Sequence, residues 1–64
     1  MDNYKDAIVE LRLKLNVSQE ELAKMLGVSF SSVNRWENGR YKPTKIAKLK
    51  LSKLFKETGI EVEE

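Results

Sequence analysis

The stretch that decides the fold is Gln19–Asn38, which reads QEELAKMLGVSFSSVNRWEN. At its start, Ser18 and Glu21 fit a capping box, in which each side chain accepts a hydrogen bond from the other residue's backbone N–H. Gly27 is suited to end the helix that begins there, because glycine adopts positive φ without strain. Ser29 is placed to cap a second helix two residues later. The stretch therefore predicts two short helices that meet at a steep angle across a tight turn.

A longer helix is expected on each side of this pair. Upstream, Asn3 fits an N-cap, and apolar residues then recur at helical spacing to about Asn16. Downstream, Asn38–Gly39 ends the second short helix, Thr44 fits the cap of the next helix, and Gly59 is suited to end it. The expected inner positions are Tyr4, Ile8, Leu11 and Leu15 in the first helix and Ala47, Leu51, Leu54 and Phe55 in the last, with Ile46 and Leu49 on its flank and Ile60 folded back onto it.

The composition limits how this fold can be held together. The 64-residue chain has no cysteine and no histidine, and 41% of its residues are hydrophobic. We therefore expect no disulfide, metal or cofactor, and a core made by apolar packing alone. No period-2 apolar alternation indicates a strand, and no apolar run approaches the roughly 20 residues of a membrane span. The prediction is an all-α, compact bundle of four or five short helices over residues 1–60, followed by a frayed acidic tail over residues 61–64.

The net charge of +2 conceals an uneven distribution. Residues 1–34 carry four cations and five acids, and residues 57–64 carry four acids and no cation. Residues 35–56 carry eight cations against Glu37 alone, which gives this segment a charge of +7. Such a block is either the footprint of a surface that binds a polyanion or a solvated, lysine-rich helix face, and composition does not decide between them.

The second short helix is expected to present a polar and cationic face to solvent. Ala23 is small where that helix passes over the first one, and Val33 and Trp36 are expected to bury against it. The residues left facing outward are Phe30, Ser31, Asn34 and Arg35. A face of this kind suits the major groove of DNA, which is just wide enough for one helix.

With these features the sequence resembles the Cro/repressor family of helix-turn-helix regulators, which are also called XRE-like and have a lambda-repressor-like fold. The segments that carry the resemblance are Ser18-Gln19-Glu20-Glu21-Leu22-Ala23, Gly27-Val28-Ser29, Val33, and Trp36-Glu37-Asn38-Gly39 followed by Lys42-Pro43. The resemblance covers roughly residues 4–56. It implies a transcriptional regulator, of the repressor type, that binds a specific double-stranded DNA sequence with a recognition helix at about residues 29–37.

The resemblance also implies roles for individual residues. The positions that face bases or adjoining phosphates in the family are occupied by Ser29, Phe30, Ser31, Asn34 and Arg35. Phosphate contacts are implied for Gln19, Asn38 and Arg40, and the positions of Lys42 and Lys45 near the start of the last helix add two more candidates. Arg12 and Glu37 match a pair that forms an internal salt bridge in relatives.

Several of these residues have a simpler structural role as an alternative. Phe30 either packs beside the core or contacts a thymine methyl group, and Arg35 either reads a guanine or contacts a phosphate. The lysines that suit a solvated helix face instead are Lys50, Lys53 and Lys56. Arg12 and Glu37 are expected to form a partly buried ion pair, whose disruption costs about 3–5 kcal/mol.

The partner expected from this interpretation is double-stranded DNA in the cytoplasm, with no membrane and no small-molecule ligand. A homodimer on a palindromic site is left open, because no full fifth helix is evident. The spare apolar residues for a dimer contact are Ile46, Leu49, Ile60 and Val62. The alternatives are a protein-interaction module, such as an antitoxin-like partner, and the DNA-binding segment of a larger protein. An enzyme is not expected, because no catalytic constellation of residues is evident.

Overall fold

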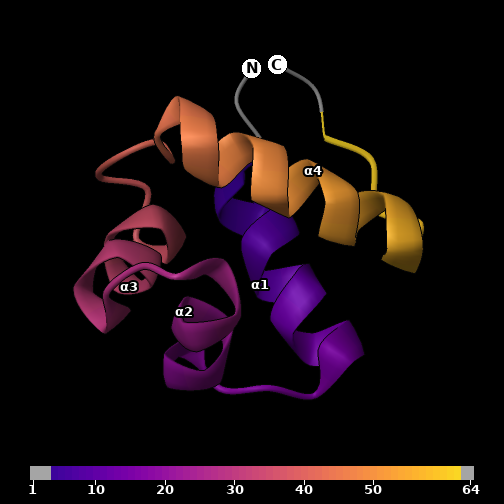
Figure 1. Ribbon diagram of the computed structural model, residues 1–64, viewed down its shortest axis with the longest axis horizontal. Coiled ribbons are helices and arrows are strands. Elements are labelled where there is room, and N and C mark those ends of the chain that lie inside the picture. The colour runs from indigo at the N-terminus through magenta and orange to yellow at the C-terminus, as the bar shows by residue number, and fades with distance from the viewer. Residues whose placement is uncertain (1–3, 63–64) are drawn as a thin grey trace.

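The computed structural model describes residues 4–62, and within this range the chain forms four α-helices and no strand. The helices are α1 (Tyr4–Leu15), α2 (Gln19–Leu26), α3 (Phe30–Glu37) and α4 (Lys45–Thr58). In Figure 1, α4 crosses α1 on one side of the molecule, while α2 and α3 lie together on the other. The all-α prediction is confirmed. The predicted cap at Asn3 and the last two residues of the acidic tail lie outside the described residues.

Hydroxyl side chains start the last three helices, as the sequence predicts. Ser18 Oγ accepts a hydrogen bond from the Glu21 backbone N–H at 3.0 Å, and the Ser18 N–H donates to Glu21 Oε1 at 2.9 Å. Ser29 and Thr44 cap α3 and α4 by accepting a bond from the backbone N–H of the residue three positions on. Each cap satisfies a backbone donor that the helix itself cannot pair.

Residues in the left-handed conformation follow three of the helices. Gly27 after α2 has a φ of 70° and Gly59 after α4 has a φ of 74°, values that glycine adopts without a steric penalty. α1 ends at Leu15 because Asn16 has a φ of 57°, which asparagine tolerates better than most residues do. The chain changes direction at each of these points, so its short helices can pack on one another.

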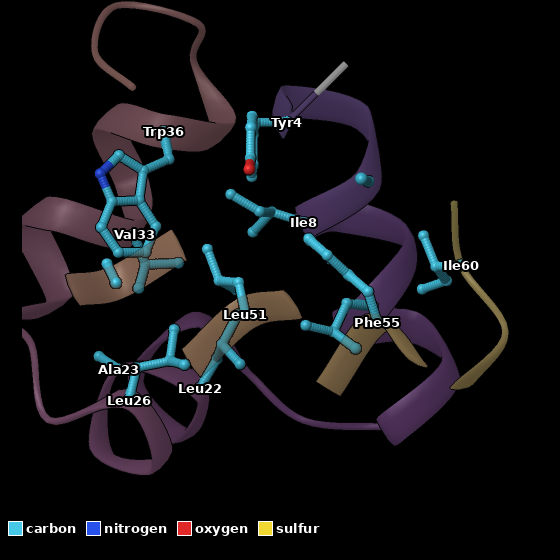
Figure 2. Packing of buried hydrophobic residues seen from close by; sticks show 13 residues of the cluster. Tyr4, Ile8, Leu22, Ala23, Leu26, Val33, Trp36, Leu51, Phe55 and Ile60 are labelled. Atoms are coloured by element: carbon cyan, nitrogen blue, oxygen red, sulfur yellow. The ribbon is translucent and has the colours of Figure 1, made fainter. Parts of the chain in front are cut away.

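The core lies where all four helices meet (Figure 2). Ala23 and Trp36 are both buried, as the helix-turn-helix geometry predicts. The residues of this buried hydrophobic core are Tyr4, Ala7, Ile8, Leu11, Leu22, Ala23, Leu26, Val33, Trp36, Ala47, Leu51, Phe55 and Ile60. The predicted fold-back of Ile60 is present, since its N–H donates to the Phe55 carbonyl at 2.8 Å and its side chain is buried.

This packing changes which apolar residues remain for a dimer contact. Ile60 is part of the core and Val62 packs against it, so the prediction that both are spare is wrong. Ile46 and Leu49 on α4 remain 70% and 69% exposed. The apolar surface of α4 that is left for a partner is therefore smaller than the sequence suggests.

Two lysines donate hydrogen bonds to backbone carbonyls at the ends of neighbouring helices. Lys50 Nζ donates to the backbone carbonyl of Leu26 at 3.0 Å and so pairs one of the carbonyls that end α2. Lys14 Nζ donates to the carbonyl of Thr58 at 3.2 Å, which joins the last turns of α1 and α4. The expectation that Lys50 belongs only to a solvated face is therefore incomplete, because its ammonium group also fixes α2 against α4.

Candidate nucleic-acid interface

The outer face of α3 is accessible to solvent. Ser31 and Arg35 are exposed, and Phe30 keeps 51% of its surface accessible. The space beneath α3 is filled by Val33 and Trp36, both buried. Phe30 is therefore not a member of the buried core, and the exposed half of its surface is available for the other predicted role, contact with a thymine methyl group.

A polar network joins α1, α2 and α3 at the edge of this face. Arg12 Nε lies 2.6 Å from Glu37 Oε2, and Arg12 Nη2 lies 3.0 Å from Glu37 Oε1. Gln19 Nε2 donates to the same Oε1 atom at 2.9 Å. Asn34 Nδ2 donates to Gln19 Oε1 at 3.3 Å, and Asn38 Nδ2 donates to Asn34 Oδ1 at 3.1 Å. A continuous series of hydrogen bonds thus runs from α1 to the residue that follows α3.

The ion pair at the inner end of this network is largely shielded from water. The Glu37 side chain is 7% exposed and the Arg12 side chain 21% exposed. The hydrogen bond to Glu37 raises the pKa of Arg12, against the opposing effect of burial. Two parallel bonds between a guanidinium and a carboxylate add geometric specificity to the attraction. The pair therefore fixes the end of α3 against α1, which sets the direction in which the outer face of α3 points.

Two of the predicted base-contacting residues are already hydrogen-bonded within the protein. Ser29 Oγ accepts from the Ser32 N–H at 3.1 Å and lies 3.0 Å from Ser32 Oγ. Asn34 donates to Gln19 and accepts from Asn38. A side-chain amide carries two N–H donors, so Asn34 keeps one for a further partner. The bond of Ser29 to the Ser32 N–H is the predicted helix cap, whereas the two bonds of Asn34 were not predicted from the sequence, although the four-residue spacing of Asn34 and Asn38 places them on one helix face.

An aromatic residue after α3 contacts Arg35, the exposed cation on the outer face of this helix. The Arg35 guanidinium carbon lies 5.4 Å from the centre of the Tyr41 ring, a distance at which a cation is attracted to an aromatic face. Tyr41 is 62% exposed, so the pair lies at the surface. Tyr41 is not among the residues predicted for the site, and its position between the cations Arg40 and Lys42 is the signal that could have identified it.

The predicted phosphate-contacting residues fall into separate places. Asn38, Arg40 and Lys42 line one cleft beside α3. Lys45 lines a different groove, which runs along α4 beside Leu49. The structure thus brings the first three together and does not bring Lys45 to them. Gln19, at the start of α2, belongs to the polar network described above.

The described residues offer hydrogen-bond donors and cations at this face rather than a cluster of metal ligands. Within residues 4–62, no group of three or more His, Cys, Asp or Glu side chains could hold a metal ion. In the same range, no helix has both the length and the apolar character needed to cross a membrane. Hydroxyl, amide, guanidinium and ammonium groups are the donors that bind phosphate oxygens and base edges in DNA.

Comparison with known proteins gives a family match and two similar regulators. The family model described as helix-turn-helix matches residues 8–62. An uncharacterised HTH-type transcriptional regulator of Archaeoglobus fulgidus is 40% identical over 48 residues, which are 75% of this chain and 68% of the relative. A protein of the same description from Methanocaldococcus jannaschii is 39% identical over 49 residues, which are 77% of this chain and 70% of the relative. No solved structure matches the chain significantly.

Proposed function

Because the chain belongs to the helix-turn-helix family of DNA-binding transcriptional regulators, we propose that it represses transcription by binding a specific duplex sequence with α3 in the major groove. The observation that carries the proposal is the exposed face of α3, which the Arg12–Glu37 pair and the amides beside it hold in one orientation. A recognition helix needs such support, because its side chains must meet base edges at defined positions.

Base contacts in this proposal come from the outer face of α3, through Ser29, Phe30, Ser31, Asn34 and Arg35. Arg35 is the strongest candidate, since a guanidinium pairs with guanine O6 and N7 in the commonest specific contact. Phe30 suits the methyl group of thymine, because half of its surface is exposed. Asn34 would use its remaining N–H, so its contribution depends on the bonds it makes to Gln19 and Asn38.

Phosphate contacts flank these base contacts and fix the register of the protein on the duplex. The residues proposed for this role are Gln19, Asn38, Arg40, Lys42 and Lys45. Arg40 and Lys42 follow α3 directly and are exposed. Lys45, which lines a separate groove, would meet a phosphate farther along the strand. We expect no catalytic activity from the protein itself.

A homodimer on a palindromic site is part of the proposal. Two-fold dimers of helix-turn-helix proteins bind half-sites about one helical turn apart. Ile46 and Leu49 on α4 are the exposed apolar residues that would form the contact. The chain spans about 68–70% of the two relatives, so the alternative is that it is a DNA-binding segment whose dimer contact lies in another part of a larger protein.

Selection of bound duplexes from a random pool, followed by a salt titration, tests the proposal. We expect an enriched consensus sequence. We also expect the logarithm of the affinity to fall linearly with the logarithm of the salt concentration, with a slope of about 0.9 per phosphate neutralised. The absence of salt-dependent binding to any duplex would overturn DNA recognition and favour a protein-interaction module of the antitoxin type. An asymmetric consensus that contains one half-site would overturn only the homodimer.

A further inference from the structure

A basic cleft lies beside α3, between the first turn of α1 and the loop that joins α3 to α4. Its volume is about 460 Å³. The side chains that matter for its chemistry are Lys5 from α1, Asn38, Arg40, Tyr41 and Lys42 from the loop, and Trp36 from the last turn of α3. Among the residues that the structure describes, those that line the cleft include three cations and no acidic residue, so the cleft is suited to bind an anion.

Lys5 reaches the loop because Gly39 leaves room for it. Gly39 has a φ of 75°, and a Cβ atom at this position would lie 3.3 Å from Lys5 Cδ. The methylene groups of Lys5 therefore pass close to the Gly39 backbone, and Lys5 lines the same cleft as Arg40 and Lys42. Lys5 is exposed, so its ammonium group is accessible to a ligand. None of the sequence motifs identified Lys5, which lies outside the cationic block of residues 35–56.

The cleft is continuous with the outer face of α3. Asn38, which lines the cleft, donates its side-chain hydrogen bond to Asn34 on α3. Tyr41, which also lines it, has its ring 5.4 Å from the Arg35 guanidinium carbon. A DNA strand that meets Asn34 and Arg35 would therefore bring its next phosphates toward this cleft.

We propose that the cleft is a phosphate-binding subsite in which Lys5 from α1 and Arg40 from the α3–α4 loop bind one phosphodiester group of the duplex that α3 reads. The inference rests on the proposed function and adds to it a contact from α1. An ammonium and a guanidinium that line one cleft can both donate hydrogen bonds to one phosphate group and offset its charge. The subsite positions the protein on DNA and carries no sequence information of its own.

The same chemistry would suit a free phosphate or nucleotide, and the experiment separates the two sources. Fluorescence anisotropy measures the affinity of wild-type protein and of K5Q for the selected duplex between about 0.05 and about 0.3 M salt, a range over which the Debye length falls from about 14 to about 6 Å. One lost phosphate contact lowers the slope of log affinity against log salt by about 0.9. Counterion release alone then weakens K5Q binding about eightfold at 0.1 M salt and about fourfold at 0.2 M.

Two further variants serve as controls. K5R keeps the positive charge and should keep the wild-type slope. K53Q removes an exposed lysine of α4 that lies outside the cleft, so its slope should also equal that of the wild type. Thermal unfolding of each variant shows that a change in affinity does not come from loss of the fold.

The outcomes distinguish this inference from the proposed function. If the wild type binds no duplex in a salt-dependent way, the proposed function fails and the subsite fails with it. If the wild type binds and K5Q has the same slope, the subsite alone is overturned. In the absence of DNA, inorganic phosphate and a nucleoside monophosphate should shift the amide resonances of Gly39 and Arg40 only at millimolar concentrations. Micromolar binding of either would assign the cleft to a free ligand and overturn the backbone contact.

Discussion

Replacing Glu37 with alanine tests the network that holds α3. The Glu37 carboxylate accepts two hydrogen bonds from Arg12 and one from Gln19. E37A leaves the guanidinium without its carboxylate and the Gln19 amide without this acceptor. Removing one partner of a buried ion pair costs about 3–5 kcal/mol. Because the Arg12 side chain is 21% exposed and water can reach part of it, we expect the lower end, about 3 kcal/mol.

A loss of this size is large for a 64-residue domain, whose total stability is on the order of 3–10 kcal/mol. It corresponds to a fall in Tm of about 12–24 °C. Urea denaturation followed by the fluorescence of Trp36, which is buried in the core, measures the loss directly. A loss below about 1 kcal/mol is typical of an exposed ion pair and would refute the reasoning.

Two more variants separate the ion pair from the packing of its side chains. E37Q removes the charge but keeps a carbonyl acceptor, so its stability should lie between those of the wild type and E37A. R12M/E37L replaces both partners with apolar side chains, and it should be more stable than E37A because no uncompensated charge remains. A double variant no more stable than E37A would show that the loss arises from packing.

Two further substitutions and one pH titration test the turn at Gly27, the contact of Tyr41 with Arg35, and the capping box of Ser18 and Glu21. Gly27→Ala should destabilise the protein by about 1–2 kcal/mol, because residue 27 has a φ of 70°, and an unchanged denaturation midpoint would contradict this. The hydrogen bond from the Ser18 backbone N–H lowers the pKa of Glu21 in the folded protein. The capping box therefore contributes fully to stability at pH values above the unfolded-state pKa of about 4.3. This contribution is lost as the pH falls through the lower pKa of the folded state. An NMR titration that gives Glu21 the ordinary glutamate pKa would contradict that assignment. Y41A should weaken DNA binding about two- to fivefold, because it removes the ring that contacts the Arg35 guanidinium. Y41F keeps the ring and should bind DNA as tightly as the wild type does. If Y41A also binds as tightly as the wild type, Tyr41 does not have this role.

Local features of the fold were predictable from the sequence because their signals lie within a few residues. The capping box needs only Ser18 and Glu21 at a spacing of three, and its two hydrogen bonds form as expected. Gly27 marks the turn for a similar reason, since positive φ is a property of one residue. Trp36 is buried because its spacing from Val33 defines one face of a short helix.

Contacts between distant segments were less predictable, because they depend on how the helices pack. Gln19 and Asn34 are fifteen residues apart, and nothing in either segment indicates their hydrogen bond. Lys50 resembles any solvated lysine until α4 is packed against the carbonyl end of α2. Ile60 was expected both to fold back and to be available for a dimer, and its burial leaves only the first.

The most direct test of the central claim, that α3 reads a DNA sequence, compares the affinity of the protein for its selected duplex with that for a scrambled duplex of the same composition. The comparison is made at one salt concentration of about 0.15 M, because the phosphate term is then common to both duplexes. Base recognition by α3 predicts that the selected duplex binds about a thousandfold more tightly. Equal affinity for the two duplexes would contradict the claim, because the protein would then bind DNA only through its phosphates, whatever the base sequence.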